Sequence, residues 1–372
     1  MINSLLQITY KNLIKPILFR FDAEDVHDFA IEIGSKFSQI RFIQLLFKQL
    51  FYVNSKVLKT TLFNLKFNSP VGLSAGFDYE GKITGITPYL GFGFESAGTV
   101  TYKPYEGNQK PRLGRLPKSK SLLVNKGFKS SGIKQMVNNL IFINGFNLGL
   151  SIGATNSIDC ATPDTQIEDI LNTFKYVKAH PVFKKLSYLE LNISCPNVKG
   201  AGTLANEYNL YSVLSKIKEL NLNKPLFIKF PIEIEHSYAR KLVQIMVDFK
   251  VEAIIVGNLA KNRDNDLLDK TELENIGAGN FSGKPTFNLS NELISIIYKD
   301  FGKEIKIIGV GGIFTPEDAY EKIKRGASLV QLITGMIYEG PQLVSQINSG
   351  LIKLLNQDGY DNINQAVGSY YN

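Results

Sequence analysis

The feature that most constrains the fold of this chain is a regular alternation of strand-like and helix-like segments from about Leu62 to the C-terminus. Short apolar runs typical of buried strands are separated by amphipathic stretches with helical periodicity. We expect eight strands, near residues 70–75, 92–98, 147–152, 186–194, 225–230, 252–257, 305–310 and 328–333. The expected helices lie near residues 81–90, 130–144, 164–179, 205–220, 234–249, 286–300, 315–325 and 341–356.

Eight consecutive β/α units are typical of an α/β fold, the closed (β/α)8 or TIM barrel. The segment "LFNLKF", residues 62–67, precedes the first unit and is expected to form a strand that covers the bottom of the barrel. A doubly wound open sheet is the alternative.

Composition narrows the function classes. The 372 residues are 44% hydrophobic, which is enough for a large core. Two cysteines argue against a disulfide framework, and the three histidines form no metal-binding pattern, so no metal site is expected. The net charge of +8 suits an anionic partner, but no zinc finger, RNP-like motif or concentrated basic tract suggests nucleic acid.

The first sixty residues differ from the rest and are expected to form a helical extension (1–60) to the barrel (61–372). Two apolar segments with basic edges, residues 1–21 and 36–53, flank the acidic patch "DAEDVHD", and Pro16 is expected to kink or end the first helix. Neither segment reaches the roughly 18 uninterrupted apolar residues of a spanning helix. The extension therefore either packs on the barrel or lies on a membrane surface.

Active sites of such barrels are built at the C-terminal ends of the strands. The fourth expected strand ends in "NISCPNVKG", where Cys195 is compatible with either a buried structural thiol or a reactive one. Lys229 ends the fifth strand, where a buried ammonium is costly unless an anion or dipole meets it. Glycines and a threonine after the last two strands predict a backbone nest for a phosphorylated ligand: Gly311, Gly312, Thr334 and Gly335.

Several motifs in order resemble the dihydroorotate dehydrogenases, FMN-containing barrel enzymes of pyrimidine synthesis: "SPVGLSAGFD", "AGTVTYKPYEGNQKPRL", "NISCPNVKG", "NFSGKP", "IIGVGGI" and "GASLVQLITG". The resemblance covers nearly the whole chain. The segment "LFRFDAEDVHDFA" resembles the extension of the membrane-associated, quinone-reducing branch, whereas a cysteine at position 195 resembles the cytosolic branch. Tyr79 stands where the family usually has lysine and Ser151 where it has asparagine, and "LLVNKGFKSSG" is one residue out of step around Asn125.

The resemblance implies oxidation of (S)-dihydroorotate to orotate in de novo UMP synthesis, with Cys195 removing the C5 proton and FMN accepting the C6 hydride. It implies flavin contacts from Ala75, Gly76, Thr99, Ser151, Asn192, Lys229, Gly257, Gly283, Gly311, Gly312, Ile333 and Thr334. The implied substrate contacts are Tyr79, Asn125, Phe128, Asn192, Asn197 and Asn258.

Quinone is the implied final electron acceptor, reached through the N-terminal extension on the cytoplasmic face of a membrane. An apolar tunnel is expected from Leu5, Leu6, Phe42, Leu46 and Phe47, with a lipid-binding edge of Lys11, Lys15, Arg41 and Lys48.

Three alternatives stay open. The same reaction with fumarate or NAD as acceptor is favoured by Cys195. A flavin-free phosphate-binding isomerase or aldolase would use Lys229 as acid, base or Schiff-base amine. A membrane-surface module without catalysis is suggested by Tyr79 and Ser151. The colour and the turnover of the pure protein test the last two alternatives, and reoxidation of the reduced flavin by quinone, fumarate or NAD tests the first.

Overall fold

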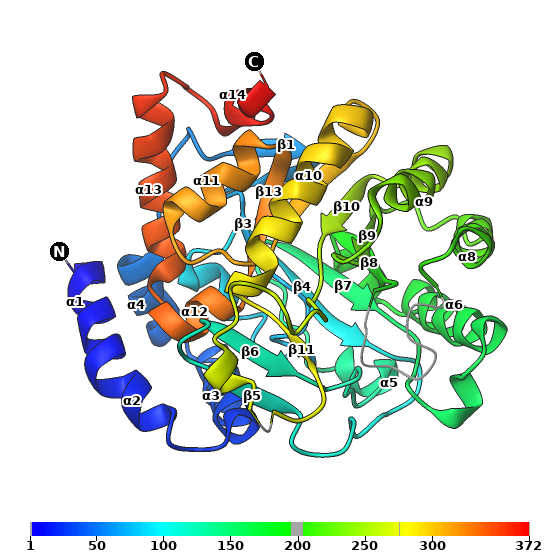
Figure 1. Ribbon diagram of the computed structural model, residues 1–372, viewed down its shortest axis with the longest axis horizontal. Coiled ribbons are helices and arrows are strands. Elements are labelled where there is room, and N and C mark those ends of the chain that lie inside the picture. Colours follow the sequence, from blue (N-terminus) through cyan, green and yellow to red (C-terminus); the bar gives the residue numbers. More distant parts are fainter. Residues whose placement is uncertain (1, 195–203, 275, 372) are drawn as a thin grey trace.

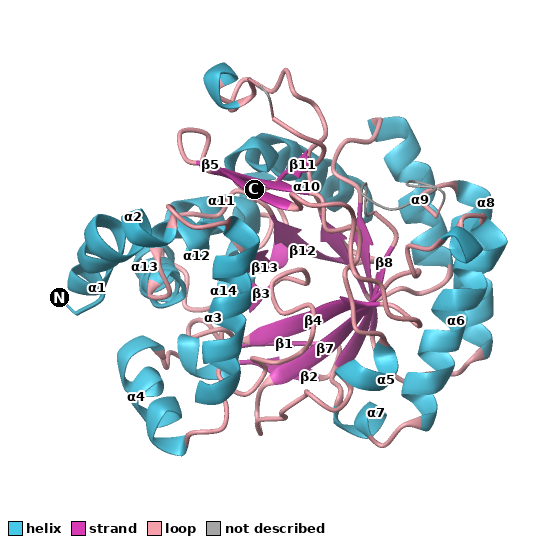
Figure 2. Cartoon of the chain, turned by 90° about the horizontal axis from the view of Figure 1, so that it is seen from below, coloured by secondary structure: helices cyan, strands magenta, loops and turns pink. Residues whose placement is uncertain are grey.

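In the computed structural model, eight parallel strands close into a barrel that helices surround (Figures 1 and 2). The structure describes residues 2–194, 204–274 and 276–371. Around the barrel the strands follow the order β10, β12, β13, β3, β4, β7, β8, β9. Their bounds are β3 (Val71–Leu73), β4 (Phe94–Val100), β7 (Asn147–Ile152), β8 (Tyr188–Asn192), β9 (Leu226–Phe230), β10 (Ala253–Val256), β12 (Lys306–Val310) and β13 (Ala327–Leu332). The barrel prediction is confirmed, and the open sheet is excluded.

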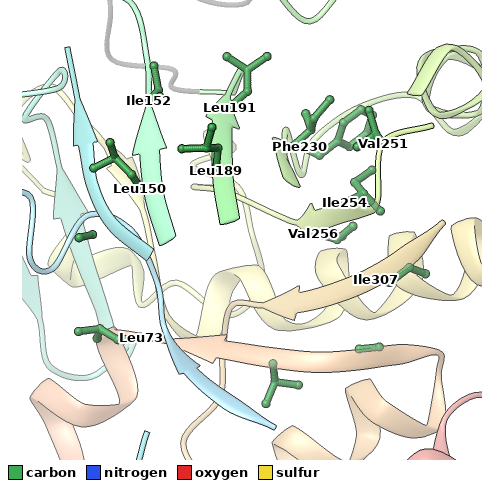
Figure 3. Close-up of a cluster of buried hydrophobic side chains, with 14 of the residues drawn as sticks. Leu73, Leu150, Ile152, Leu189, Leu191, Phe230, Val251, Ile254, Val256 and Ile307 are labelled. Atoms are coloured by element: carbon green, nitrogen blue, oxygen red, sulfur yellow. The ribbon is translucent and has the colours of Figure 1, made fainter. Parts of the chain in front are cut away.

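Strand residues alternate between the outer and inner sides of the barrel. Leu189 and Leu191 of β8 belong to the large hydrophobic cluster shared by the barrel and its helices, part of which Figure 3 shows. Tyr188 and Phe227 belong to a separate cluster of strand and hairpin residues, where their rings stack with centroids 4.4 Å apart. The lower barrel interior is therefore a packed apolar core.

The barrel interior becomes polar toward the C-terminal ends of the strands. In β8 the residues that share the side of Tyr188 are Glu190 and Asn192, and in β9 Lys229 follows Phe227 on the same side. Glu190, Asn192 and Lys229 are all buried. Charged and amide groups thus lie above the apolar layer, at the end of the barrel where function is expected.

A two-stranded hairpin covers the bottom of the barrel. It consists of β1 (Thr60–Leu62) and β2 (Leu65–Phe67), so the single strand expected at residues 62–67 is wrong, although its position is confirmed. The chain reverses at Phe63 and Asn64, whose φ angles of 56° and 60° suit a tight hairpin turn. The Phe63 ring packs against Phe227, with centroids 5.0 Å apart, and thereby closes the apolar layer.

Six expected outer helices are confirmed: α6 (Pro163–Ala179), α8 (Glu207–Glu219), α9 (His236–Asp248), α10 (Phe287–Phe301), α11 (Pro316–Lys324) and α13 (Leu343–Gln357). Two are much shorter than expected. Residues 81–90 contain only the 3-10 turn Thr87–Leu90, because two glycines and a proline interrupt the segment. Residues 130–144 contain only α5 (Ile133–Met136), since Ile141 N–H donates to the Thr84 hydroxyl instead of to a helical carbonyl.

The remaining short helical elements are α7 (Val182–Lys185), α12 (Thr334–Glu339), α14 (Ile363–Ala366) and the 3-10 turns Ile158–Cys160, Lys270–Glu272, Lys284–Thr286 and Ser369–Tyr371.

The extension contains α1 (Ile2–Thr9), a π-helical turn (Tyr10–Ile14), α2 (Lys15–Leu18), α3 (Ala23–Phe37) and α4 (Arg41–Phe51). Pro16 does not end the first helix, which instead passes through the π turn just before it. The acidic patch forms the start of α3, where the Asp22 carboxylate accepts from Glu24 N–H at 2.8 Å and from Asp25 N–H at 3.1 Å. Among the described residues, no helix combines the length and apolar character needed to cross a bilayer.

A small antiparallel sheet that we did not expect from the sequence lies beside α3 (Figure 1). Its strands are β5 (Leu113–Leu116), β6 (Ser121–Val124) and β11 (Asn280–Phe281). Together, α3 and this sheet form a wall above the C-terminal ends of the barrel strands.

Candidate active site

A cavity that encloses about 1240 Å³ of empty space, including its open mouth, lies at the C-terminal ends of the barrel strands. Most of the expected flavin and substrate residues line it: Ala75, Gly76, Tyr79, Thr99, Phe128, Asn192, Lys229, Gly257, Asn258, Gly283, Gly311, Gly312, Ile333 and Thr334. Cys195 and Asn197 lie outside the described residues. The C-terminal ends of the strands therefore bring together residues from widely separated segments of the chain.

One end of the cavity is a glycine cradle. Gly311 and Gly312 have φ angles of 105° and 72°, which side chains other than glycine rarely adopt. A Cβ on Gly311 would lie 2.4 Å from Thr286 Oγ1, so the backbone there tolerates no side chain. The Thr334 hydroxyl lies 2.8 Å from the Ser282 hydroxyl at the same end. The backbone N–H groups of a glycine turn, together with hydroxyls, suit a phosphate group.

Lys229 provides a positive charge inside the cavity wall. Its Nζ donates to Ser74 Oγ and to the Ala75 carbonyl, both at 3.2 Å. These two neutral acceptors orient the ammonium. In a buried site, such a charge interacts strongly with a ligand that carries or develops negative charge.

Ser151 does not line the cavity but lies beneath its floor. Its hydroxyl donates to Glu190 Oε1 at 2.7 Å. The Ser151 oxygen therefore accepts a hydrogen bond from the Thr99 hydroxyl, 3.0 Å away. Asn192 Nδ2 in turn donates to Thr99 Oγ1 at 3.0 Å. The buried Glu190 carboxylate thus terminates a one-way chain of hydrogen bonds that fixes the orientation of the Asn192 amide.

Asn258 is fixed in the same way. Its Nδ2 donates to Ser194 Oγ at 2.8 Å, and the Ser194 hydroxyl donates to Asn192 Oδ1 at 3.2 Å. Two amides from different strands are therefore pre-oriented at the cavity floor, where they offer both donors and acceptors to a ring with alternating N–H and C=O groups.

The opposite end of the cavity contains aromatic and basic side chains. The Tyr79 ring stacks on His27 of α3, with centroids 5.5 Å apart and an interplanar angle of 17°. Lys126 Nζ lies 4.4 Å from the Tyr79 ring centroid. The Tyr79 hydroxyl donates to Asp28 Oδ1 at 2.9 Å, and burial together with the Asp28 carboxylate raises the pKa of Tyr79. The phenol is therefore neutral and acts as a platform for Lys126.

The comparisons with known proteins agree with this geometry. The family model of dihydroorotate dehydrogenase matches residues 57–355. The chain belongs to the dihydroorotate dehydrogenase family. It is 36% identical over 349 residues to a dihydroorotate dehydrogenase (quinone) of Christiangramia forsetii, with 92% of this chain and 99% of the relative covered.

A dihydroorotate dehydrogenase (quinone) of Trichodesmium erythraeum is 34% identical, with 96% of this chain and 98% of the relative covered. The crystal structure of DHODH from Eimeria tenella in complex with ferulenol has a TM-score of 0.82 at 28% identity, covering 94% of this chain and 96% of that chain. The expected family, barrel fold and enzyme class, an oxidoreductase, are confirmed. Enzymes of this family are flavoproteins.

Asn125 is not among the residues that line the cavity. Leu122, Val124 and Lys126 line it instead, because the strand alternation of β6 continues past its last residue and turns every second side chain toward the cavity. Asn125 Oδ1 accepts from Asn108 Nδ2 at 3.0 Å. The wall residues His27, Lys126 and Lys129 were missed, although the period of two in "LLVNK" pointed to Lys126.

The five residues expected to form an apolar tunnel do not line this cavity. The described cavity wall receives only His27 from the extension. Apolar side chains from the small sheet and from the last two β/α units line the mouth instead, namely Leu113, Leu122, Ile313 and Ile337. Phe19 of the extension packs at this mouth against Tyr338, with ring centroids 5.6 Å apart.

Proposed function

We propose that the chain oxidises (S)-dihydroorotate to orotate, with FMN as its flavin and quinone as the final electron acceptor, in de novo pyrimidine (UMP) synthesis. The observation that carries this proposal is the convergence of a glycine cradle, a buried lysine and two oriented asparagines in one cavity. Family membership supports the reaction, and the cradle suits a flavin that ends in a single phosphate.

The cavity fits FMN at both the phosphate and the ring. Gly283, Gly311, Gly312 and Thr334 would hold the phosphate, and Lys229 would lie beside the electron-accepting edge of the ring. FMN, when bound, supplies the hydride acceptor. The Lys229 ammonium favours negative charge on that ring edge, and Ser74 and Ala75 keep the ammonium in place.

The chain's own residues bind the substrate ring and move its proton. Asn192 and Asn258, with Asn197, would pair with the amide and carbonyl groups of the dihydropyrimidine ring. Cys195 would remove the C5 proton, since a thiol with an ordinary pKa of about 8.5 needs less activation than a serine hydroxyl.

Quinone would approach through the apolar mouth at Leu113, Leu122 and Ile337, which the extension borders through Phe19. The extension would dock on the cytoplasmic face of a membrane. It exposes large apolar side chains at Leu5, Ile8, Leu13, Ile14, Ile17, Phe21, Phe42, Leu45 and Leu46. These residues suit the boundary between lipid head groups and acyl chains.

The basic edge is smaller than expected. Lys11 Nζ pairs with Glu339 at 2.7 Å, and Lys15 Nζ donates to the Tyr338 carbonyl at 3.2 Å, so both hold the extension on the barrel. Arg41 donates to the Tyr89 hydroxyl at 3.0 Å. Exposed Arg20 and Lys48 are the basic groups that we assign to anionic lipid, at about 1 kcal/mol each.

Anaerobic half-reactions test the redox proposal. The purified protein is expected to carry one non-covalent FMN, to lose flavin colour on addition of dihydroorotate and to regain it with a soluble quinone. Fumarate and NAD are added in parallel. Release of FAD, a colourless protein or a flavin that dihydroorotate does not reduce would overturn the reaction, and faster reoxidation by fumarate or NAD would overturn the acceptor.

Surface variants test membrane docking without removing α3, which contributes His27 to the cavity. Replacing Leu13, Ile17 and Phe42 by serine should abolish sedimentation with anionic vesicles while leaving dihydroorotate-driven flavin reduction intact. Ile158→Ser serves as the control. It removes an apolar side chain outside the extension that is at least as exposed as Leu13, Ile17 and Phe42. Vesicle binding that is equal in both variants would rule out this surface.

A further inference from the structure

Lys126 interacts with four charged groups, the carboxylates of Glu24 and Asp28 and the cations Lys129 and Arg112. A third carboxylate near Tyr79, Glu80, accepts from Ser131 N–H at 2.9 Å. Glu24 pairs with Arg112 Nε at 3.0 Å and with Lys129 Nζ at 3.2 Å, and Asp28 pairs with Lys129 Nζ at 3.5 Å. Within the described residues, no carboxylate oxygen lies within 4.0 Å of Lys126 Nζ. Among the three cations of this group, Lys126 is therefore the one without a carboxylate in direct contact within the described residues.

His27 does not supply the missing negative charge, but it orients Lys126. The Phe77 carbonyl, 2.8 Å from His27 Nε2, can only accept, so the ring proton is on Nε2. Burial lowers the pKa of His27 and keeps the ring neutral, which leaves a lone pair on Nδ1. Two groups lie near this nitrogen, the Asp28 carboxylate at 3.4 Å and Lys126 Nζ at 3.5 Å. The carboxylate only accepts, so Lys126 is the group that can donate to Nδ1.

The Lys126 ammonium is thus held on two sides, by the lone pair of His27 and by the face of the Tyr79 ring. An ammonium has three N–H donors, and these two contacts leave donor capacity in a side chain that lines the cavity. A partly buried cation without a countercharge is costly, and a bound anion removes that cost. A ligand in the cavity that carries one negative charge would supply the missing partner of Lys126.

We propose that Lys126, positioned by His27 and Tyr79, binds the carboxylate of dihydroorotate and of orotate. This inference rests on the proposed function, whose substrate carries one carboxylate. The other cavity lysine, Lys229, is held by Ser74 and Ala75 on the barrel side, where we assign the flavin. Lys126 would then favour a ring that carries a carboxylate, while Asn192 and Asn258 would bind the amide and carbonyl groups of the ring.

Ligand pairs that differ only in charge test the subsite. Orotate and its neutral amide are titrated into the FMN-loaded enzyme, and affinity is read from the flavin absorbance. In Lys126→Met, which keeps the alkyl stem over Tyr79, orotate affinity should fall about 10- to 100-fold, the usual scale of a charged hydrogen bond. The affinity for the neutral amide should change less than about threefold, and Lys126→Arg should recover much of the preference for orotate.

The outcomes separate this inference from the proposed function. An orotate-to-amide affinity ratio in Lys126→Met equal to that of the wild type would overturn the carboxylate subsite while leaving the reaction standing. A wild-type flavin that dihydroorotate cannot reduce would overturn the reaction, and the subsite with it. Equal losses for both ligands would show that Lys126 supports the shape of the cavity only, and would also overturn the proposal.

Discussion

The two ends of the cavity are built in different ways. The phosphate end uses short motifs that each follow a strand, namely Gly283 after β11, Gly311 and Gly312 after β12, and Thr334 after β13. The carboxylate end uses side chains from three separate segments, His27 of α3, Tyr79 after β3 and Lys126 after β6. Each part of the first end is therefore a local motif at a strand end, whereas the second end exists only once the extension and the small sheet have folded against the barrel.

The largest effect is expected at the phosphate end, from Gly311→Ala. The new Cβ would meet Thr286 Oγ1 at 2.4 Å on a backbone with φ of 105°, so the cradle must shift. We expect the protein to lose most of its FMN on gel filtration, measured as the ratio of flavin to protein absorbance. Gly145→Ala is the matched control, because its φ is also positive, at 78°, but no atom lies within 4 Å of the new Cβ. Equal flavin retention in both variants would show that the cradle does not hold the cofactor.

A smaller effect, confined to one chemical step, is expected from Cys195→Ala. Loss of a general base slows proton transfer by about 10²-fold or more, so flavin reduction by dihydroorotate should slow by that factor while FMN stays bound. Cys160→Ala removes the other, buried cysteine and should leave the rate unchanged. Reduction of Cys195→Ala at the wild-type rate would mean that this thiol is structural.

The carboxylate end should respond to pH. Burial lowers the pKa of Lys126 to about 8, so the ammonium is intact below pH 8 and is lost above it. Orotate affinity should therefore fall about tenfold between pH 7 and pH 9, and Lys126→Arg should abolish this fall. The neighbouring groups do not produce it: Tyr79 has a raised pKa and His27 a lowered one, and Glu24, Asp28, Arg112 and Lys129 are engaged in ion pairs. A flat profile in the wild type would mean that Lys126 does not bind the carboxylate in its charged form.

The same contrast explains what the sequence predicts. The barrel strands and the cradle follow from periodicity and from glycines at strand ends, which are local signals. The orienting role of Ser151 does not, because its partner Glu190 comes from the neighbouring strand and is reached only through the barrel register. The helix expected at residues 130–144 fails for a similar reason. Thr84, which lies outside this segment, accepts a hydrogen bond from the Ile141 N–H.

The smallest effect is expected from Tyr79→Phe, which separates the two roles of this residue. The substitution removes the hydrogen bond to Asp28, 2.9 Å long, but keeps the ring that faces Lys126. Because Asp28 also pairs with Lys129, the loss should cost about 1 kcal/mol of stability and change orotate affinity less than about threefold. Tyr79→Leu removes the ring face as well, and a cation–π contact of about 1 kcal/mol corresponds to roughly a fivefold weaker orotate complex. If Tyr79→Phe weakened orotate as much as Lys126→Met does, the phenol hydroxyl itself would contact the substrate, and the ring would not be merely a platform for the lysine.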